Sequence, residues 1–329
     1  VSTIRHTPDE LAAYAQIIDQ HDFRRQLVTD WLAQNDIPLR FDAIIGRGGL
    51  IKPIPGGVYR VNRKMCFETY YALRKHACNL GCILAYELAK EQGGGCQAYI
   101  ADPVTVDELV PEARVSGSPL MPRLAIWHAL NQRAIARRYA RQVGCSYNDL
   151  NLIVCHLGGG ISVAAHEHGR AIDANNALDG EGPLSPERAG TLPAADLIHL
   201  CYSGRYTEEQ LKKRVAGQAG LMAHLGTTDI LQIMQMIEQG NERARLLINA
   251  MIFHTAKQIA AEGAVLCGQV DAILLTGGMA HSTYITEGIK QRVSYLAPVH
   301  VFPGEDEMEA LALNALAVLR GECQAKEYE

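Results

Sequence analysis

Short apolar runs alternate along the chain with longer stretches in which apolar residues recur at helical spacing. Strands are predicted at residues 41–45, 97–101, 152–156, 161–166, 270–275 and 299–302. Helices are predicted at 8–34, 122–143, 208–216, 229–239 and 243–263, and one or two helices at 65–92, with a glycine-punctuated loop at 217–226. A last helix is predicted from one apolar face made of Met308, Leu311, Ala312, Ala315, Leu316 and Leu319. The alternation of helices and strands indicates an α/β architecture.

Four of the predicted strands end in small or charged residues. These ends are Gly46 to Gly49, Asp102, Gly158 to Gly160, and Gly277 with Gly278. Ligands of open α/β sheets bind beyond the carboxyl ends of the strands. We therefore expect these four ends to line one cleft.

The run of three glycines at 158–160 predicts a phosphate site. It joins two predicted strands, and glycine allows a tight turn whose backbone N–H groups can face an anion. A glycine-rich hairpin without a ligand is the alternative, but His156, Asp173, Glu181 and Arg188 crowd the same stretch of sequence. A Walker lysine loop is absent, and the glycines lead into a strand rather than a helix, which argues against a dinucleotide-binding fold.

Composition narrows the class of protein. The chain has 329 residues, 48% of them hydrophobic and 20% charged, which is typical of a soluble enzyme of two domains or one large one. A formal charge of -5 disfavours a nucleic-acid partner, and no apolar run is long enough to cross a membrane, so we expect a cytoplasmic protein. Nine cysteines without paired spacing indicate reduced thiols, and Cys155 and Cys267 are expected in the core. Arg133, Arg137 and Arg141 are expected on an exposed helix face.

Six sequence motifs together resemble the acetokinase family, within the larger group of sugar kinases, chaperone ATPases and actin. They are residues 46–57 (GRGGLIKPIPGG), 126–132 (IWHALNQ), 156–160 (HLGGG), 176–183 (NALDGEGP), 185–188 (SPER) and 275–278 (LTGG). The resemblance runs nearly end to end. It implies an α/β fold of two actin-like (ribonuclease H-like) domains with a nucleotide cleft between them. The first domain would comprise 1–120 and 305–329, and the second 121–304.

The same resemblance implies an activity, the ATP-dependent and reversible phosphorylation of a short-chain carboxylate, butanoate foremost, to an acyl phosphate. Asp102 matches the aspartate that orients the acceptor carboxylate and the metal, and Arg47 matches the arginine that holds the substrate carboxylate. His128 and Arg188 match residues that stabilise the phosphoryl group in flight. Guanidinium groups suit these tasks because each offers paired donors to two oxygens.

Nucleotide and metal ligands follow from the resemblance as well. His156, Gly158, Gly159 and Gly160 match the phosphate hairpin, and Gly277 and Gly278 match the adenosine loop. Glu305 and Asp306, together with Asp102, fall where the family places magnesium-linked carboxylates. The implied ligands are ATP or ADP, Mg²⁺ and a short-chain fatty acid, and the implied assembly is a homodimer or a higher homo-oligomer.

Two other functions remain open at this point. An actin-like module that binds nucleotide without catalysis would keep the glycine loops, but Asp102, His128 and Arg188 together speak against it. A kinase that phosphorylates a hydroxyl group would need a general base, whereas a carboxylate is already ionised at neutral pH.

The start of the chain departs from the family pattern. The family opens with a strand carrying an Asn-x-Gly-Ser-x-Ser-x-Lys loop, and no such loop precedes Val1. We expect residues 1–4 to lie at or beside a central sheet, with a sheet edge next to the strand that ends at Gly46 to Gly49.

Overall fold

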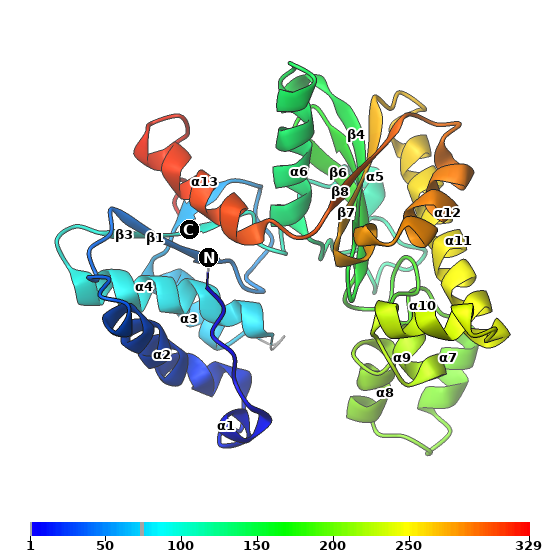
Figure 1. The fold of residues 1–329 in the computed structure, drawn as a ribbon, viewed down its shortest axis with the longest axis horizontal. Coiled ribbons are helices and arrows are strands. Elements are labelled where there is room, and N and C mark those ends of the chain that lie inside the picture. The colour runs from blue at the N-terminus through cyan, green and yellow to red at the C-terminus, as the bar shows by residue number, and fades with distance from the viewer. Residues whose placement is uncertain (1, 73–75) are drawn as a thin grey trace. The chain divides into compact units, whose positions relative to one another are not determined.

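The computed structural model describes residues 2–72 and 76–329, and the chain forms two compact units (Figure 1). One unit comprises Val1–Val106 together with Asp306–Glu329, and the other comprises Asp107–Glu305. The units therefore divide at 106/107 and 305/306, where the sequence analysis places the boundaries at 120/121 and 304/305.

The first unit is built on a three-stranded sheet with the order β1-β3-β2. The strands are β1 (Ala43–Arg47), β2 (Val58–Arg60) and β3 (Gln97–Ala101). β1 runs parallel to β3, and β2 runs antiparallel to it. Its helices are α1 (Pro8–Ala12), η1 (Ile17–Gln20), α2 (His21–Gln34), α3 (Arg63–Tyr70), η2 (Ala77–Asn79), α4 (Leu80–Gln92) and α13 (Glu307–Leu319).

Two glycines let α4 pack closely against the sheet. A Cβ atom on Gly46 would lie 2.1 Å from the carbonyl oxygen of Gly81, so a side chain at either position would push the helix away from β1. This contact fixes the strand end that carries Arg47. The sheet therefore presents Arg47 and Asp102 at neighbouring strand ends, because Arg47 pairs with Ala101 in the ladder.

The amino-terminal region differs from the predicted helix at 8–34. The helix is interrupted between α1 and η1, where the side chain of Asp19 accepts a hydrogen bond from the backbone N–H of Gln16 and starts a new helical segment. β1 is an edge strand of the described sheet, as expected. Val1 lies outside the described residues, and residues 2–4 belong to no strand.

The predicted apolar face of the last helix is buried only in part. Leu311 and Ala315 are buried, whereas Met308 and Leu319 are about half exposed at 59% and 49%. α13 packs against the three strands of the small sheet, and its buried positions, Ala310 included, lie near its middle. Helical periodicity predicts which residues share the apolar face of α13, but the width of the three-stranded sheet limits how much of that face is buried.

The second unit is built on a five-stranded sheet with the order β6-β5-β4-β7-β8. The strands are β4 (Asn151–Leu157), β5 (Ile161–Glu167), β6 (Arg170–Ala174), β7 (Ala272–Gly277) and β8 (Val299–Pro303). β4 pairs antiparallel with β5 and parallel with β7, so the glycine hairpin and the end of β7 are neighbours. The helices are α5 (Pro111–Arg114), α6 (Ala129–Gln142), η3 (Tyr147–Asp149), α7 (Ala194–Cys201), α8 (Glu208–Val215), α9 (Gly220–Leu225), α10 (Ile230–Glu238), α11 (Glu242–Val265), η4 (Gly278–His281) and α12 (Thr283–Val293).

Three expectations for this unit are wrong. Arg133 is 7% exposed and forms an ion pair with Glu108 at 3.0 Å, so it does not lie on a solvated face. Cys267 is exposed in a left-handed turn after α11, although Cys155 is fully buried as expected. The loop expected at 217–226 contains the short helix α9, whose first residue, Gly220, has a positive φ of 58° and packs against the backbone of Ser185 where a Cβ atom would clash.

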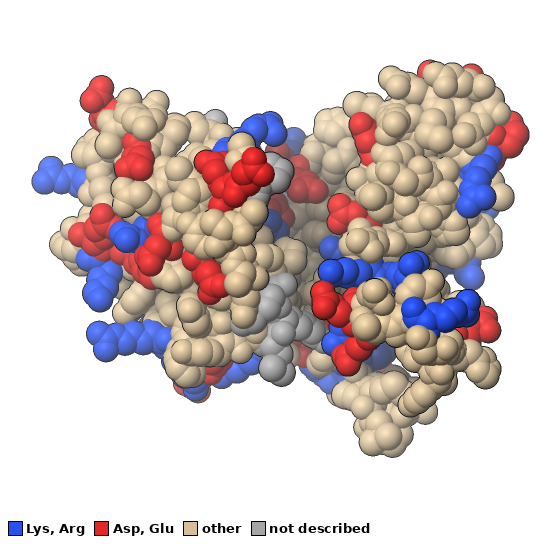
Figure 2. Space-filling view, turned by 90° about the horizontal axis from the view of Figure 1, so that it is seen from below, with Lys and Arg blue, Asp and Glu red and all other residues tan. Residues whose placement is uncertain are grey.

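Among the described residues, no helix is both long enough and apolar enough to cross a membrane. All nine cysteines are free thiols. Acidic and basic side chains are both present on the visible face of each unit (Figure 2).

Candidate active site

The glycine hairpin between β4 and β5 is the centre of the candidate site in the second unit. Gly158 donates its N–H to the carbonyl of Gly160, which closes the turn. A Cβ atom on Gly158 would lie 2.9 Å from Nε2 of His156, and one on Gly159 would lie 3.1 Å from the carboxylate of Glu187. A side chain at Gly158 would press on the His156 ring, and one at Gly159 would require the Glu187 carboxylate to shift. Without side chains, the turn presents a bare backbone of the kind that binds phosphate.

The segment 185–188 is fastened to this hairpin. The carbonyl oxygen of Gly159 accepts hydrogen bonds from the Ser185 hydroxyl at 2.7 Å and from the Glu187 N–H at 3.0 Å. As a result, Arg188 lies next to the hairpin, with its side chain within 4 Å of where a Cβ of Gly160 would be.

Arg188 is positioned as an anion-binding group. Its Nη1 donates to the carbonyl of Ala177 at 3.1 Å, whereas its buried Nε–H has no hydrogen-bond partner among the described residues. Burial lowers the pKa of its guanidinium, while the charges of Glu187 and Asp179 act in the opposite direction. The guanidinium nevertheless remains protonated at neutral pH, and a partly buried donor without a partner favours a bound anion.

A cavity of about 710 Å³ lies beside the hairpin, within the second unit. Gly158 and Gly159 line one part of it, and Gly278 lines another. The remaining lining residues come from the segment 185–188, the loop before α10, α10 itself, η4, the start of α12 and the turn after β8: Pro186, Glu187, Thr228, Asp229, Ile230, Leu231, Met234, Met279, His281, Ser282, Thr283, Tyr284 and Glu305. The volume is that of an ordinary small-molecule site.

The two glycines after β7 differ in what they do. A Cβ atom on Gly278 would meet nothing within 4 Å, and this residue faces the cavity. Gly277 does not line the cavity. It has a φ of 94°, and a Cβ there would lie 2.5 Å from the carbonyl oxygen of Leu157, so its role is to let β7 approach β4.

Two histidines stack beside the hairpin. The rings of His128 and His156 lie 3.8 Å apart with 13° between their planes. His128 is the residue before the first turn of α6, later than the predicted helix start, and its Nδ1 lies 2.7 Å from the Ser162 hydroxyl. His156 is 1% exposed, with Nδ1 2.8 Å from the Asn131 side-chain oxygen and Nε2 3.2 Å from Glu305. Glu305 thus lies at both the histidine pair and the cavity.

In the first unit, the strand ends carry a second group of candidate residues. Asp102 is 1% exposed, has a φ of 38°, and accepts a hydrogen bond from the Gly57 N–H at 2.7 Å. Arg47 forms an ion pair with Glu307 at 3.0 Å, which ties the end of β1 to the start of α13. Glu307 holds the guanidinium of Arg47 in place, a contact that sequence spacing does not reveal.

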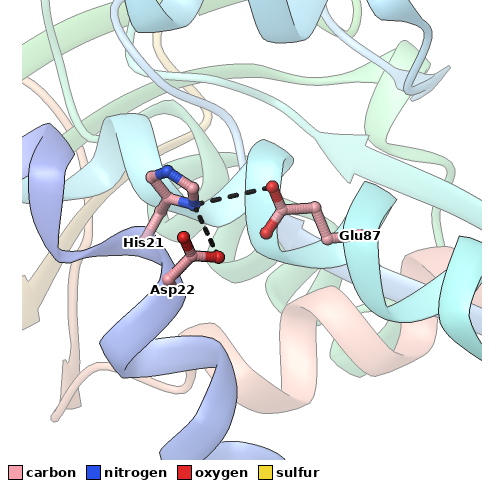
Figure 3. Close-up of side chains that lie close together, drawn as sticks. All are labelled: His21, Asp22 and Glu87. Carbon is pink, nitrogen blue, oxygen red and sulfur yellow. Dashed lines mark ion pairs between the residues drawn. The ribbon is translucent and has the colours of Figure 1, made fainter.

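A cluster of His21, Asp22 and Glu87 resembles a metal site in composition but is an ion-pair network between α2 and α4 (Figure 3). Nδ1 of His21 lies 3.5 Å from each of the two carboxylates. The guanidinium of Arg25 lies 3.7 Å from Asp22 and 3.8 Å from Glu87, and it also pairs with Glu91 at 2.7 Å. Arg25 therefore offsets one of the three negative charges of Asp22, Glu87 and Glu91, and the network joins α2 to α4.

The fold and the site define a protein of the acetokinase class, and comparison with known proteins agrees. The model of the Acetokinase family matches residues 125–300. A protein of Bacteroides thetaiotaomicron named "Probable butyrate kinase" is 60% identical over 329 residues, covering all of this chain and 93% of the relative. "Butyrate kinase 2" of Clostridium acetobutylicum is 47% identical over 99% of this chain and 92% of the relative. The chain belongs to the acetokinase family.

Solved structures of the same class share the fold. The acetate kinase of Porphyromonas gingivalis superposes with a TM-score of 0.71 at 18% identity, covering 84% of this chain and 77% of that one. A propionate kinase of Francisella tularensis superposes with a TM-score of 0.75 at 17% identity, covering 87% and 82%. The predicted α/β fold of the actin-like class is therefore confirmed.

Several residues of the site were not expected from the sequence. Glu187 and Asp229 line the cavity, while Asn131, Gln132 and Ser162 hold the histidines. Asn131 and Gln132 belong to the motif at 126–132 and Glu187 to the motif at 185–188, but no spacing rule shows that their side chains face the hairpin. Only the fold brings them there.

Proposed function

We propose that the protein is a butyrate kinase, which transfers the γ-phosphoryl group of ATP to butanoate and, in reverse, forms ATP from butanoyl phosphate. The observation that carries the proposal is the cavity that joins the glycine hairpin to Gly278, with Arg188 fastened alongside. Relatives at 47% and 60% identity carry the name butyrate kinase, and butanoate is therefore the first acceptor to test.

The nucleotide would lie with its phosphates at Gly158 to Gly160 and its adenosine toward Gly278. Backbone N–H groups of the hairpin suit phosphate oxygens, and the open space at Gly278 suits a bulky ring. His156, at the base of the hairpin, would support the phosphate end. Gly277 would contribute to the nucleotide site indirectly, because its lack of a side chain lets β7 pack close to β4.

The transfer we propose is a direct in-line displacement. One oxygen of the butanoate carboxylate forms a bond to the γ-phosphorus, and the bond from that phosphorus to the β,γ-bridging oxygen breaks, leaving the electron pair on ADP. The carboxylate is already ionised, so no proton has to be removed. The protein positions the two reactants and neutralises charge: Arg47 and Asp102 orient the acceptor, and Arg188 and His128 stabilise the transferring group.

Magnesium fits the chemistry of the cavity. Glu187, Asp229 and Glu305 line it, whereas none of its lining residues is Lys or Arg. A polyphosphate would meet carboxylates there, so it would bind with a divalent cation that prefers oxygen ligands. We propose that Glu305, Asp306 and Asp102 hold Mg²⁺. The ion would supply charge neutralisation on the phosphate oxygens.

We further infer a cytoplasmic protein that acts on a short-chain fatty acid and assembles as a homodimer or a higher homo-oligomer. Nine free thiols support a reducing compartment. Light scattering coupled to gel filtration would determine the oligomeric state.

A hydroxylamine trap for acyl phosphate tests the activity. We expect the protein, given Mg-ATP and butanoate, to form a hydroxamate with release of ADP, and to do so more efficiently with butanoate than with acetate. Acetate, propionate, isobutyrate and valerate complete the acceptor panel, and a sugar serves as the hydroxyl acceptor. ATP binding by calorimetry without any hydroxamate would support a non-catalytic nucleotide-binding module and overturn the proposal.

A further inference from the structure

Five polar side chains form a continuous hydrogen-bonded chain through the interior of the second unit. The chain runs from Tyr147 to His166, Gln132, Ser162 and His128. The distances are 2.7 Å from the Tyr147 hydroxyl to Nδ1 of His166, 3.1 Å from Nε2 of His166 to Oε1 of Gln132, 2.8 Å from Nε2 of Gln132 to Oγ of Ser162, and 2.7 Å from that Oγ to Nδ1 of His128. His166, Gln132 and Ser162 are fully buried.

The direction of donation is fixed at Gln132. Its amide nitrogen lies 3.1 Å from the backbone carbonyl of Ser162, which can only accept a hydrogen bond. The NH₂ group must therefore face Ser162, and Oε1 must face His166. Turning the amide over would place two oxygens against each other in a site without water access.

This orientation determines the proton position on His166. Oε1 of Gln132 accepts, so Nε2 of His166 carries the proton and Nδ1 presents a lone pair. The Tyr147 hydroxyl then donates to that lone pair. Burial lowers the pKa of His166 to about 3, and the charges of Arg133 and Arg137 act in the same direction, which agrees with a neutral ring.

The same reasoning determines the proton position on His128. Oγ of Ser162 accepts from the Gln132 amide at 2.8 Å and from the backbone N–H of His128 at 3.3 Å. A hydroxyl has two lone pairs and one hydrogen, so both lone pairs are used and the hydrogen is left for Nδ1 of His128. Nδ1 is thus an acceptor, and the ring proton lies on Nε2.

We propose that the Tyr147–His166–Gln132–Ser162 chain is a positioning relay that holds His128 as the neutral Nε2–H tautomer, so that it acts as a hydrogen-bond donor and not as a base. The inference rests on the proposed function, in which His128 faces the transferring phosphoryl group. A donor without a basic nitrogen suits an acceptor that has no proton to lose. It would not serve a hydroxyl acceptor, which needs a base.

Nitrogen-15 NMR of the histidine side chains tests the relay without any measurement of activity. In two-bond ¹H–¹⁵N spectra of the full chain, we expect His128 and His166 to show Nε2 as the protonated nitrogen and Nδ1 as the unprotonated one. His128→Gln and His166→Gln variants assign the signals. A His128 ring protonated on Nδ1 near neutral pH, either alone or together with Nε2, would overturn the proposal.

Substitution within the relay tests its effect on the reaction. Gln132→Met has a similar length but no NH₂ donor, so a lone pair on Oγ of Ser162 is freed and His128 can become protonated on Nδ1 and donate to it. We expect this tautomer change in the spectrum and a loss in kcat of about tenfold or more. KM for ATP should stay within about twofold, because neither Gln132 nor Ser162 lines the nucleotide cavity. Ser162→Ala should lower kcat similarly, and Ser162→Thr, which keeps the hydroxyl, should restore much of it.

The exposed His168, in the turn after β5, gives a matched control because its ring lies outside the relay and hydrogen-bonds to the Asn148 carbonyl. His168→Gln should leave kcat unchanged. A fall in kcat accompanied by an equal rise in KM, with an unchanged His128 tautomer in Gln132→Met, would show a merely structural role. If the parent protein forms no acyl phosphate, the proposed function fails, while the NMR spectra still decide whether the relay exists.

Discussion

Glu262 makes the stability of the second unit depend on pH in a direction opposite to that of most carboxylates. It lies in α11, its side chain is 1% exposed, and its Oε2 has no hydrogen-bond partner among the described residues. Burial, followed by the nearby charge of Asp173, raises the pKa of Glu262 to about 8, although Gln258 donates a hydrogen bond to its Oε1 at 2.8 Å. Arg123 offsets little of this because Asp173 and Glu181 already pair with it.

The magnitude follows from linkage between protonation and folding. The folded state binds the Glu262 proton more tightly than the unfolded state, whose ordinary pKa is 4.5. Stability is therefore highest below pH 4.5 and falls as pH rises through 8. Between pH 5 and 9 the loss from this one group amounts to about 4 kcal/mol. Glu262→Gln removes the titration, so the variant should gain about 4 kcal/mol relative to the parent over that range.

Urea unfolding at several pH values measures this difference. The chain has two tryptophans, Trp31 in the first unit and the buried Trp127 in the second, so a Trp31→Phe background makes fluorescence report on the unit that contains Glu262. Glu242→Gln, on the exposed first turn of the same helix, is the control and should show no such pH trend. A stability difference between Glu262→Gln and the parent that stays constant from pH 5 to 9 would refute the reasoning.

Three further substitutions test the site. Arg188→Ala should lower kcat by about a hundredfold or more, because the guanidinium beside the phosphate hairpin is lost. Arg188→Lys should recover only part of the lost activity. Turnover of Arg188→Ala equal to the parent's in the hydroxamate assay would contradict this role. Gly278→Val should raise KM for ATP about tenfold or more with little change in Tm or in KM for butanoate, since the new side chain enters the cavity without touching the fold. Gly277→Ala should instead lower the free energy of unfolding in urea by about 2–4 kcal/mol, because Gly277 has a positive φ and its new Cβ would collide with the Leu157 backbone. Similar effects of the Gly277 and Gly278 changes would show that the roles assigned to the two glycines are wrong.

Local sequence signals were sufficient for the long or strongly patterned elements. The strand at 97–101 has the predicted bounds, and β4, β5 and α11 lie within two residues of theirs, because an apolar run or a helical stripe is decided by neighbours in sequence. Short elements with mixed composition, such as β2 and β6, were not predicted. β2 pairs with β3, about 40 residues further along the chain, so its stabilising contacts leave no local pattern. β6 instead follows β5 across the two-residue turn at 168–169, a local hairpin signal that the apolar pattern did not include.

For the site, the sequence by itself determined the glycine hairpin, Arg188 and the membership of a kinase family, because glycine and arginine motifs encode backbone geometry and charge directly. Tertiary structure alone decided that Gly278 faces a cavity while Gly277 serves strand packing, and that Glu307 holds Arg47. It also decided the proton position on His128, since a lone pair on Ser162 is assigned only when every donor around it is known. A sequence specifies which groups are present, but the hydrogen-bonding state of each group depends on neighbours that folding brings together from distant segments.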